Sequence, residues 1–326
     1  MAAKMETIGV LTSGGDAPGM NAAIRAVVRT GWHLGIKVMG IYRGYNGLLE
    51  GGEIKVLNPR DLGDTIQRGG TVLYTARSER FKEDEAQWEA IETAKKLGID
   101  GLVVIGGDGS FQGARKLSLK GLPCVGVPGT IDNDISSSSY TIGYDTAMNT
   151  AVEMVDKLRD TAQSHDRCSI VEVMGRHAGH LALNTGIACG ATAILVPEVP
   201  YDFERDILER IEQARATGKQ HFIIIVAEGA DVRMEDLAKQ IEGSTGIESR
   251  TTVLGHVQRG GSPTLRDRVI ASQMGNKAVH LLKEGVGNRV VIYQNDKIMD
   301  MDIFQALEMK KTIDYDLLQI SKELTI

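Results

Sequence analysis

The sequence predicts an α/β fold made of two doubly wound, Rossmann-like lobes with mainly parallel sheets. Short apolar runs alternate with longer amphipathic runs along the chain, which is typical of alternating strands and helices. Several short runs are apolar at successive positions, as expected for strands that helices cover on both faces. The length of 326 residues is also more than one small core needs and is ample for two lobes.

Eight short apolar runs are predicted to be strands, at residues 8–12, 38–42, 101–105, 124–127, 169–173, 193–196, 222–227 and 290–293. Longer amphipathic runs predict helices at residues 20–34, 85–97, 146–161, 205–217 and 265–283. We expect the chain to cross between lobes near Gly143 and to return near Gly260. One lobe would then contain residues 1–143 and 262–310, and the other residues 144–261 and 311–326.

Composition excludes several classes of partner. The formal net charge is −6, so no global basic field attracts nucleic acid or an acidic membrane. No run approaches the roughly 18 apolar residues that span a bilayer, and the first residues lack the apolar stretch of a signal peptide. Cys124, Cys168 and Cys189 lack metal-like spacing, and the first two begin apolar runs, which predicts reduced, core-filling thiols. We therefore expect a cytoplasmic protein.

Open α/β sheets bind ligands beyond the carboxyl ends of their strands, so the loops that follow the strands matter most. The first such loop, at residues 12–19, reads Thr-Ser-Gly-Gly-Asp-Ala-Pro-Gly. Its glycines let backbone N–H groups face an anion, and the helix that follows adds a positive dipole. Taken alone, a tight turn without a ligand is an equally good interpretation.

A second glycine loop, Gly-Gly-Asp-Gly-Ser at residues 106–110, follows the strand at 101–105. Asp108 would face the same ligand as the exposed amides, and a bridging Mg²⁺ is the usual way to place a carboxylate beside phosphates. Alternatively, Asp108 caps the next helix. Gln112 stands where a dinucleotide fingerprint needs its third glycine, and the Gly218-Lys219 pair lacks the rest of a Walker A motif. Hydride transfer and P-loop hydrolysis therefore lose support.

The third loop, at residues 128–134, reads Pro-Gly-Thr-Ile-Asp-Asn-Asp. Asp132 and Asp134, beside the Thr130 hydroxyl, could share the metal-binding and proton-accepting duties that phosphoryl transfer requires. In isolation an Asx-turn is the better interpretation. The loop is the third one to follow a strand in the same half of the chain, and this position favours a functional role.

The second half of the chain carries Arg176, Glu228, Arg250, His256 and Arg259. Arginine forks bind phosphate oxygens in a bidentate manner, although a lone Arg or His is more often a solvated or packing residue. Arg176 and Glu228 each lie just beyond an apolar strand, which favours a ligand. We expect a polar, phosphorylated metabolite, with Glu228 accepting hydrogen bonds from its hydroxyls.

Taken together, these segments resemble the bacterial 6-phosphofructokinases. The matching stretches are residues 9–23, 106–110, 128–134, 171–176 and 253–263, and they follow the family's order along nearly the whole chain. The resemblance implies transfer of a phosphoryl group from Mg-ATP to the 1-hydroxyl of fructose 6-phosphate, a step of glycolysis that gives fructose 1,6-bisphosphate and ADP.

The resemblance also implies roles for individual residues. Asp132 would accept the proton of the sugar hydroxyl, Thr130 and Arg176 would assist catalysis, and Asp108 would hold Mg²⁺. The implied ATP-binding residues are Gly15, Arg77, Ser78, Gly107, Asp108, Gly109 and Ser110. The implied sugar-phosphate residues are Thr130, Ile131, Asp132, Arg167, Met174, Gly175, Arg176, Glu228, Arg250, His256, Val257, Gln258 and Arg259. Arg167 and Arg250 match arginines that in this family reach in from a neighbouring subunit, which implies a homotetramer.

Two glycines bear on the phosphoryl donor. Relatives that use pyrophosphate typically carry an aspartate at the position of Gly109 and a lysine at that of Gly129. An aspartate there would crowd and repel the α-phosphate of ATP, whereas glycine leaves room for it. The sequence therefore favours ATP over pyrophosphate.

Family members often bind ADP or phosphoenolpyruvate at an effector site between subunits. Arg25, Arg29, Arg159 and Lys219 correspond to basic residues of that site. Thr192 replaces the usual acidic residue, Gln220 a common lysine and Pro59 an arginine. We therefore expect an anion-binding effector site with an altered response to ADP.

Three alternatives remain open at this point. A pyrophosphate-dependent phosphofructokinase is the nearest. A lipid or NAD kinase shares the Gly-Gly-Asp-Gly loop but would lack Arg176, Glu228, His256 and Arg259. A catalytically silent nucleotide-binding regulator belongs to a different class and would be expected to have lost Asp108 or Asp132.

Overall fold

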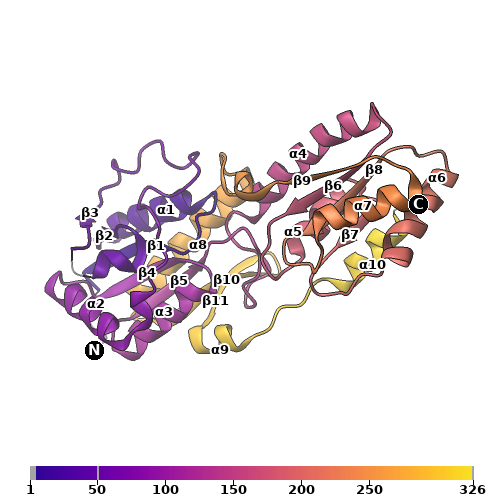
Figure 1. Cartoon of the computed structure of the whole chain (residues 1–326). Helices are drawn as coiled ribbons and strands as arrows, with labels where there is room; N and C mark the ends of the chain where they lie inside the picture. Colours follow the sequence, from indigo (N-terminus) through magenta and orange to yellow (C-terminus); the bar gives the residue numbers. More distant parts are fainter. Residues whose placement is uncertain (1–4, 50, 325–326) are drawn as a thin grey trace. The chain divides into compact units, whose positions relative to one another are not determined.

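The computed structural model describes residues 5–49 and 51–324, which form two compact units (Figure 1). The described residues of unit 1 fall within Met1–Ile131, Ile135–Thr146 and Arg259–Lys311. Those of unit 2 fall within Asp132–Asp134, Ala147–Gln258 and Thr312–Ile326. Each unit has its own sheet and its own hydrophobic core.

Unit 1 contains a seven-stranded sheet in the order β11-β10-β5-β4-β1-β2-β3. Its strands are β1 Thr7–Ser13, β2 Lys37–Ile41, β3 Ile54–Val56, β4 Gly101–Gly106, β5 Cys124–Pro128, β10 Arg289–Gln294 and β11 Lys297–Asp302. The five inner strands pair in parallel, and only the two edge strands, β3 and β11, run antiparallel to their neighbours. The prediction of a mainly parallel sheet is confirmed.

Helices cover both faces of this sheet. Helices α1 (Met20–His33) and α8 (Leu265–Lys283) pack together and against β2, β4 and β5. Helices α2 (Asp84–Lys96) and α3 (Asp108–Leu119) contribute to the core cluster on the other face, where α9 (Ile303–Glu308) joins them. All six residues of β4 are buried, as expected for a strand covered on both sides.

Unit 2 contains a parallel sheet in the order β7-β8-β6-β9. Its strands are β6 Cys168–Val173, β7 Ala193–Leu195, β8 Phe222–Ala227 and β9 Ser249–Val253. Alternate residues of a strand point to opposite faces, and Phe222, Ile224 and Val226 of β8 form a core with η3 (Glu204–Leu208), α6 (Glu209–Ala216) and α7 (Met234–Thr245). Helix α5 (His180–Ala188) packs against β7, β8 and α10 (Tyr315–Glu323).

The eight predicted strands are found within one or two residues of their expected ends, and helix α8 matches its prediction at both ends. The helix expected at 146–161 is α4, Tyr144–Gln163. The helix expected at 205–217 is present, but it begins with the π-helical turn η3. Helix α5 escaped prediction because it is apolar and almost fully buried, so it lacks the polar stripe of an amphipathic helix.

The three cysteines are free and buried, which confirms the prediction of core-filling thiols. Within residues 5–49 and 51–324, no helix is long and apolar enough to cross a membrane. Short 3₁₀ turns complete the described chain at η1 Gly44–Leu48, η2 Arg80–Lys82 and η4 Gly255–Arg259.

Candidate active site

The three glycine-containing loops of unit 1 begin at the same level of the sheet. Strands β1, β4 and β5 are neighbours, with Ser13 paired to Gly106 and Gly106 paired to Pro128. Because the strands are parallel, their carboxyl ends lie along one edge. The register therefore brings the loops at 13–19, 106–110 and 128–131 side by side.

Short hydrogen bonds hold these loops together. The Ser110 hydroxyl donates to the carbonyl oxygen of Ser13 at 3.0 Å, and the Gly129 N–H donates to the carbonyl oxygen of Gly106 at 3.0 Å. A Cβ added to Gly106 would lie 2.5 Å from both Ser110 Oγ and the Ser13 oxygen. Gly106 therefore has no room for any side chain, and its close contacts fix the spacing of the first two loops.

A further segment, at residues 75–78, lies against the first loop. The Gly14 N–H donates to the Ala76 carbonyl at 3.5 Å, and the Thr75 hydroxyl donates to the Gly14 carbonyl at 2.8 Å. Arg77, which follows directly, is exposed. The Ser78 Oγ is buried and makes no hydrogen bond within the described residues. Arg77 and Ser78, both predicted to bind ATP, therefore come directly after two residues that form hydrogen bonds with Gly14.

Arg259 extends to the same loop from another part of unit 1. Its Nη1 donates to the Asp16 carbonyl at 3.1 Å, and a Cβ built on Gly15 would lie only 2.6 Å from that nitrogen. Sequence reasoning grouped Arg259 with the sugar-phosphate residues of the second half of the chain. The structure places its guanidinium beside Gly15, so Arg259 adds a positive charge to the loop expected to face phosphates.

Asp108 is the first residue of α3, and the N-cap position belongs to Gly107. The alternative in which Asp108 is the helix cap is therefore wrong. The carboxylate is exposed at the positive end of the helix dipole. The described residues contain no cluster of three or more His, Cys, Asp or Glu side chains that could hold a metal ion. A single carboxylate suits Mg²⁺ in this position, because Mg²⁺ is usually bound by one or two carboxylates together with substrate phosphates.

The two glycines that bear on the donor differ in their surroundings. A Cβ added to Gly109 meets nothing within 4 Å, so the space next to it is open. A Cβ added to Gly129 would lie 3.1 Å from Ile105 and 3.2 Å from Met20. The open side of Gly109 is where an aspartate would project.

In unit 2, Asp132 and Arg176 form an ion pair. Arg176 Nε lies 3.6 Å from Asp132 Oδ2, and the side chain of Asp132 is 2% exposed whereas that of Arg176 is 50% exposed. Asn133, between the two carboxylates of the loop, has a positive φ of 51°. The geometry holds a buried carboxylate against an arginine whose other side is open to solvent.

Glu228 stabilises the turn that carries Arg176. The Gly175 and Arg176 N–H groups both donate to Glu228 Oε1, at 3.2 and 2.6 Å. Gly175 has φ 141°, and a Cβ there would lie 2.5 Å from the Ala178 carbonyl oxygen. A Cβ on Gly229 would lie 1.9 Å from the Arg176 carbonyl oxygen. The backbone around Arg176 is therefore tightly confined.

Other predicted residues join these groups. The Met174 N–H donates to Gln258 Oε1 at 3.4 Å, and Gln258 is fully buried. His256 and Val257, in the same 3₁₀ turn η4, are exposed. Thr130 and Ile131 belong to unit 1 and are buried.

Arg167 and Arg250 lie apart from Arg176. Arg167 immediately precedes β6 and Arg176 follows its carboxyl end, and the six-residue strand between them spans roughly 20 Å. Arg250, on the edge strand β9, pairs in register with Ser169 near the amino end of β6. Within this chain, these two arginines therefore cannot contact the same phosphate group as Arg176.

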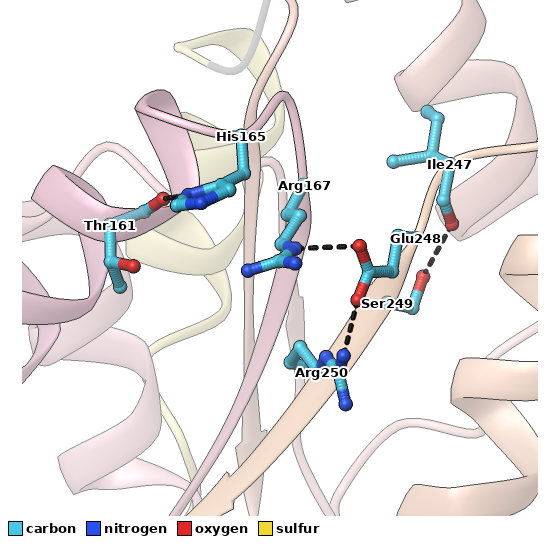
Figure 2. Close-up of polar contacts among 7 residues, drawn as sticks. All are labelled: Thr161, His165, Arg167, Ile247, Glu248, Ser249 and Arg250. Atoms are coloured by element: carbon cyan, nitrogen blue, oxygen red, sulfur yellow. Dashed lines mark hydrogen bonds and ion pairs between the residues drawn. The ribbon is translucent and has the colours of Figure 1, made fainter.

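A carboxylate that sequence reasoning missed joins the two arginines (Figure 2). Arg167 Nε donates to Glu248 Oε2 at 2.8 Å, and Arg250 Nη2 donates to Glu248 Oε1 at 2.5 Å. The hydrogen bond from Arg167, and to a lesser extent that from Arg250, holds the pKa of Glu248 below its usual value. Glu248 lies directly before β9 and two residues before Arg250, and this spacing was the available signal.

The predicted effector residues fall into two groups. Arg25 and Arg29 are one turn apart on α1, and partial burial followed by the charge of Arg29 lowers the pKa of Arg25. In unit 2, Arg159 donates to the Cys189 carbonyl and Lys219 Nζ lies 3.4 Å from Thr192 Oγ1. Burial and Arg159 lower the pKa of Lys219. Burial, Arg159 and Lys219 lower that of His221, a member of this basic group that the sequence reasoning missed.

Comparison with known proteins adds to this geometry. Residues 7–282 match the family model described as "Phosphofructokinase". The chain is 56% identical to a protein of Bacillus cytotoxicus and 57% identical to one of Bacillus mycoides, both named ATP-dependent 6-phosphofructokinase. Each match covers 99% of this chain and all of the relative.

A solved structure of phosphofructokinase from Saccharomyces cerevisiae matches with a TM-score of 0.88 and 39% identity over 98% of this chain. The chain spans about half of that longer yeast chain, 48%. The likeness therefore extends over both units of the fold described above.

Proposed function

Because this chain belongs to the phosphofructokinase family, we propose that it is an ATP-dependent 6-phosphofructokinase of glycolysis. The reaction moves the γ-phosphoryl group of ATP to the 1-hydroxyl of fructose 6-phosphate and yields fructose 1,6-bisphosphate and ADP. The bond from the γ-phosphorus to the bridging oxygen breaks, a bond to the sugar oxygen forms, and the hydroxyl proton goes to a base. The observation that carries the proposal is the near-complete match to relatives named for this activity.

Unit 1 is proposed to bind ATP. The adjacent loops at 13–19 and 106–110 supply backbone N–H groups for phosphate oxygens, and the N-terminus of α3 adds a positive dipole. Arg77 and Arg259 extend this positive environment beside Gly15. Ser78 and Ser110 contribute hydroxyl groups. The open space at Gly109 accommodates the α-phosphate, which favours ATP over pyrophosphate.

Asp108 is proposed to hold Mg²⁺. When bound, the ion neutralises phosphate charge and lowers the cost of bringing an anionic donor beside a carboxylate. The single exposed carboxylate at the start of α3 fits an ion that arrives with its nucleotide.

Asp132 is proposed to be the general base. Its side chain is buried, and the positive charge of Arg176 lies 3.6 Å from its Oδ2. Thr130 lies two residues earlier in the same loop and is proposed to orient the reacting groups. Since phosphoryl transfer asks little covalent chemistry of the protein, positioning and charge stabilisation supply most of the rate enhancement.

The turn at Met174-Gly175-Arg176 is proposed to bind the sugar phosphate with Glu228, His256, Val257 and Gln258. Glu228 Oε1 accepts two backbone N–H groups, which leaves Oε2 as the oxygen that would accept a sugar hydroxyl. His256 is exposed and offers a ring nitrogen to a phosphate oxygen. These residues lie in unit 2, whereas Ile131 and Arg259, which the resemblance also implies for sugar-phosphate binding, belong to unit 1.

Arg167 and Arg250 are proposed to bind the 6-phosphate of a sugar held by a second copy of the chain. Their separation from Arg176 by the length of β6 supports this, because one molecule cannot direct all three arginines to one ligand. Such sharing requires self-association, and a homotetramer is the state that the family resemblance implies. A cytoplasmic location belongs to the same proposal.

The basic groups Arg25 with Arg29, and Arg159 with Lys219, are proposed to bind an anionic effector such as ADP or phosphoenolpyruvate. Thr192 already accepts a hydrogen bond from Lys219 where a carboxylate is usual, so no acidic side chain at that position supports an effector-bound Mg²⁺. We expect weakened activation by Mg-ADP. Strong Mg-ADP activation in a titration would contradict this part of the proposal.

An assay of the purified chain tests the whole assignment. With fructose 6-phosphate and Mg-ATP, we expect ADP to form in step with fructose 1,6-bisphosphate, as followed by a coupled assay and by phosphorus NMR. Faster turnover with magnesium pyrophosphate would establish the alternative donor. ATP binding without turnover would establish a silent regulator.

A further inference from the structure

One buried carboxylate has no part in the proposed binding or proton transfer. Asp267, in the first turn of α8, is 0% exposed and accepts four hydrogen bonds. Oδ1 accepts the Tyr140 hydroxyl at 2.5 Å and the Gly143 N–H at 2.7 Å. Oδ2 accepts the Thr146 N–H at 2.9 Å and the Thr146 hydroxyl at 2.5 Å. Each oxygen is thus matched by two donors.

Burying a carboxylate costs free energy unless its oxygens are hydrogen-bonded, and here four donors offset that cost. All four partners donate, two of them are backbone N–H groups, and only an all-acceptor side chain satisfies them together. Asp267 is itself fixed, since its N–H donates to the N-cap hydroxyl of Thr264 at 3.3 Å. The carboxylate therefore ties the segment 140–146 firmly to the start of α8.

The same segment holds the loop that carries the proposed base. The Thr141 hydroxyl donates to the Thr130 carbonyl at 2.6 Å, and the Ile142 N–H donates to the Pro128 carbonyl at 2.9 Å. Gly129 and Ile142 form a parallel β-bridge. Asp132 follows Thr130 by two residues. A continuous chain of hydrogen bonds therefore runs from Asp267 to the backbone just before Asp132.

We propose that Asp267 is a positioning residue for phosphoryl transfer, which fixes the loop at 128–132 through Tyr140, Thr141 and Ile142. It touches no substrate in this assignment and acts only through the segment it holds. The inference rests on the proposed function, because it presupposes that Asp132 accepts the proton.

The first variant is Asp267→Asn, which keeps the shape but replaces one oxygen with an NH₂ group. That group must face at least one backbone N–H of Gly143 or Thr146, donor against donor. Since small misplacements of reacting groups cost up to about 10²-fold in rate, we expect kcat to fall about tenfold or more while the KM for ATP changes less than twofold. Kinetics are measured on folded protein, as quantified by near-UV circular dichroism.

The second variant, Thr141→Val, removes the hydrogen bond from the Thr141 hydroxyl to the Thr130 carbonyl and leaves Asp267 with all its partners. We expect kcat to fall by about three- to tenfold. If both residues act along one route, the double variant should be no slower than Asp267→Asn alone, because the effects of coupled residues do not multiply. Independent, multiplying effects would overturn the proposed route.

The control is Asp302→Asn, the same substitution at the N-cap residue of α9 in unit 1. Asp302 Oδ1 accepts the N–H groups of Phe304 and Gln305 at the start of α9. We expect this variant to melt at a lower temperature with kcat unchanged. A kcat within twofold of the wild type in Asp267→Asn, with only a lowered melting temperature, would overturn the inference. A wild-type chain without activity would instead refute the proposed function.

Discussion

The proposed ATP-binding region of unit 1, formed by the loops at 13–19 and 106–110, and the charged cluster of unit 2, formed by Asp132, Arg176 and Glu228, are built from different kinds of groups. In unit 1 the groups proposed to face the ligand are mainly backbone, placed by the register of β1, β4 and β5 and by Gly106, which has no room for a Cβ. In unit 2 they are mainly charged side chains, held by Glu228, Gln258 and the confined turn at Gly175. A backbone site is damaged by adding atoms, whereas a side-chain site is damaged by removing charges.

The largest expected effect comes from removing a charge in unit 2. In Asp132→Asn the side chain keeps its shape beside Arg176 but can no longer accept a proton. General-base catalysis typically contributes about 10²–10⁴-fold, so we expect kcat to fall by that order while the KM for fructose 6-phosphate stays within a few-fold. Steady-state kinetics with varied sugar phosphate measures both. Near-normal turnover would show that Asp132 is not the base.

The comparison also shows which features the sequence could predict. Glycine loops after apolar strands were recognisable because strand ends and glycines are local signals, and parallel pairing brings them together. Arg176 and Glu228 were recognisable in the same way, as charges directly beyond buried strands. Asp267 was not, because its partner Tyr140 lies 127 residues away in the chain, and the link from Glu248 to Arg167, 81 residues away, was equally hidden. The contact of Arg259 with the Asp16 carbonyl, 243 residues away in the chain, was unpredictable for the same reason.

Adding one methyl group to unit 2 tests whether its charged side chains also depend on closely packed backbone. In Gly229→Ala, the new Cβ would lie 1.9 Å from the Arg176 carbonyl oxygen, a backbone atom that cannot rotate away. Overpacking of this kind costs about 1–3 kcal/mol or more, so we expect a lower free energy of unfolding and a displaced Arg176 turn. Urea unfolding measures the loss of stability, and the KM for fructose 6-phosphate should rise.

Gly243→Ala is the matched control, because Gly243 lies in α7 and a Cβ there meets nothing within 4 Å. Replacing an unstrained helical glycine with alanine should raise the free energy of unfolding by about 0.5–1 kcal/mol. Equal stability of the two variants would mean that the close contact between Gly229 and the Arg176 carbonyl oxygen does not exclude a side chain at residue 229.

The arginines at the far end of β6 offer a test of sharing between copies. Arg250→Ala would remove the charge-assisted hydrogen bond proposed between Arg250 and phosphate, so we expect the KM for fructose 6-phosphate to rise about 10- to 100-fold with little change in kcat. Mixed oligomers of this variant and Asp132→Asn should regain activity at low sugar phosphate, because some sites then combine an intact Asp132 with an intact Arg250. Mixed oligomers no more active than the average of the two parents would contradict the sharing of sites.

The smallest expected effect concerns the reactivity of the three cysteine thiols, which have no role in either proposed binding region. Burial raises the pKa of Cys124 in unit 1 and of Cys168 in unit 2 to about 12, and that of Cys189 to about 11. Because the thiolate is the reactive form, all three thiols should resist a chromogenic disulfide reagent at pH 8 in the folded protein. Cys189 should react first as the pH is raised, since its pKa lies lowest, and all three should react at once in guanidinium. Rapid reaction of Cys124 in the folded state would show that the core of unit 1 opens more readily than that of unit 2, and that the backbone-built region is the less rigid of the two.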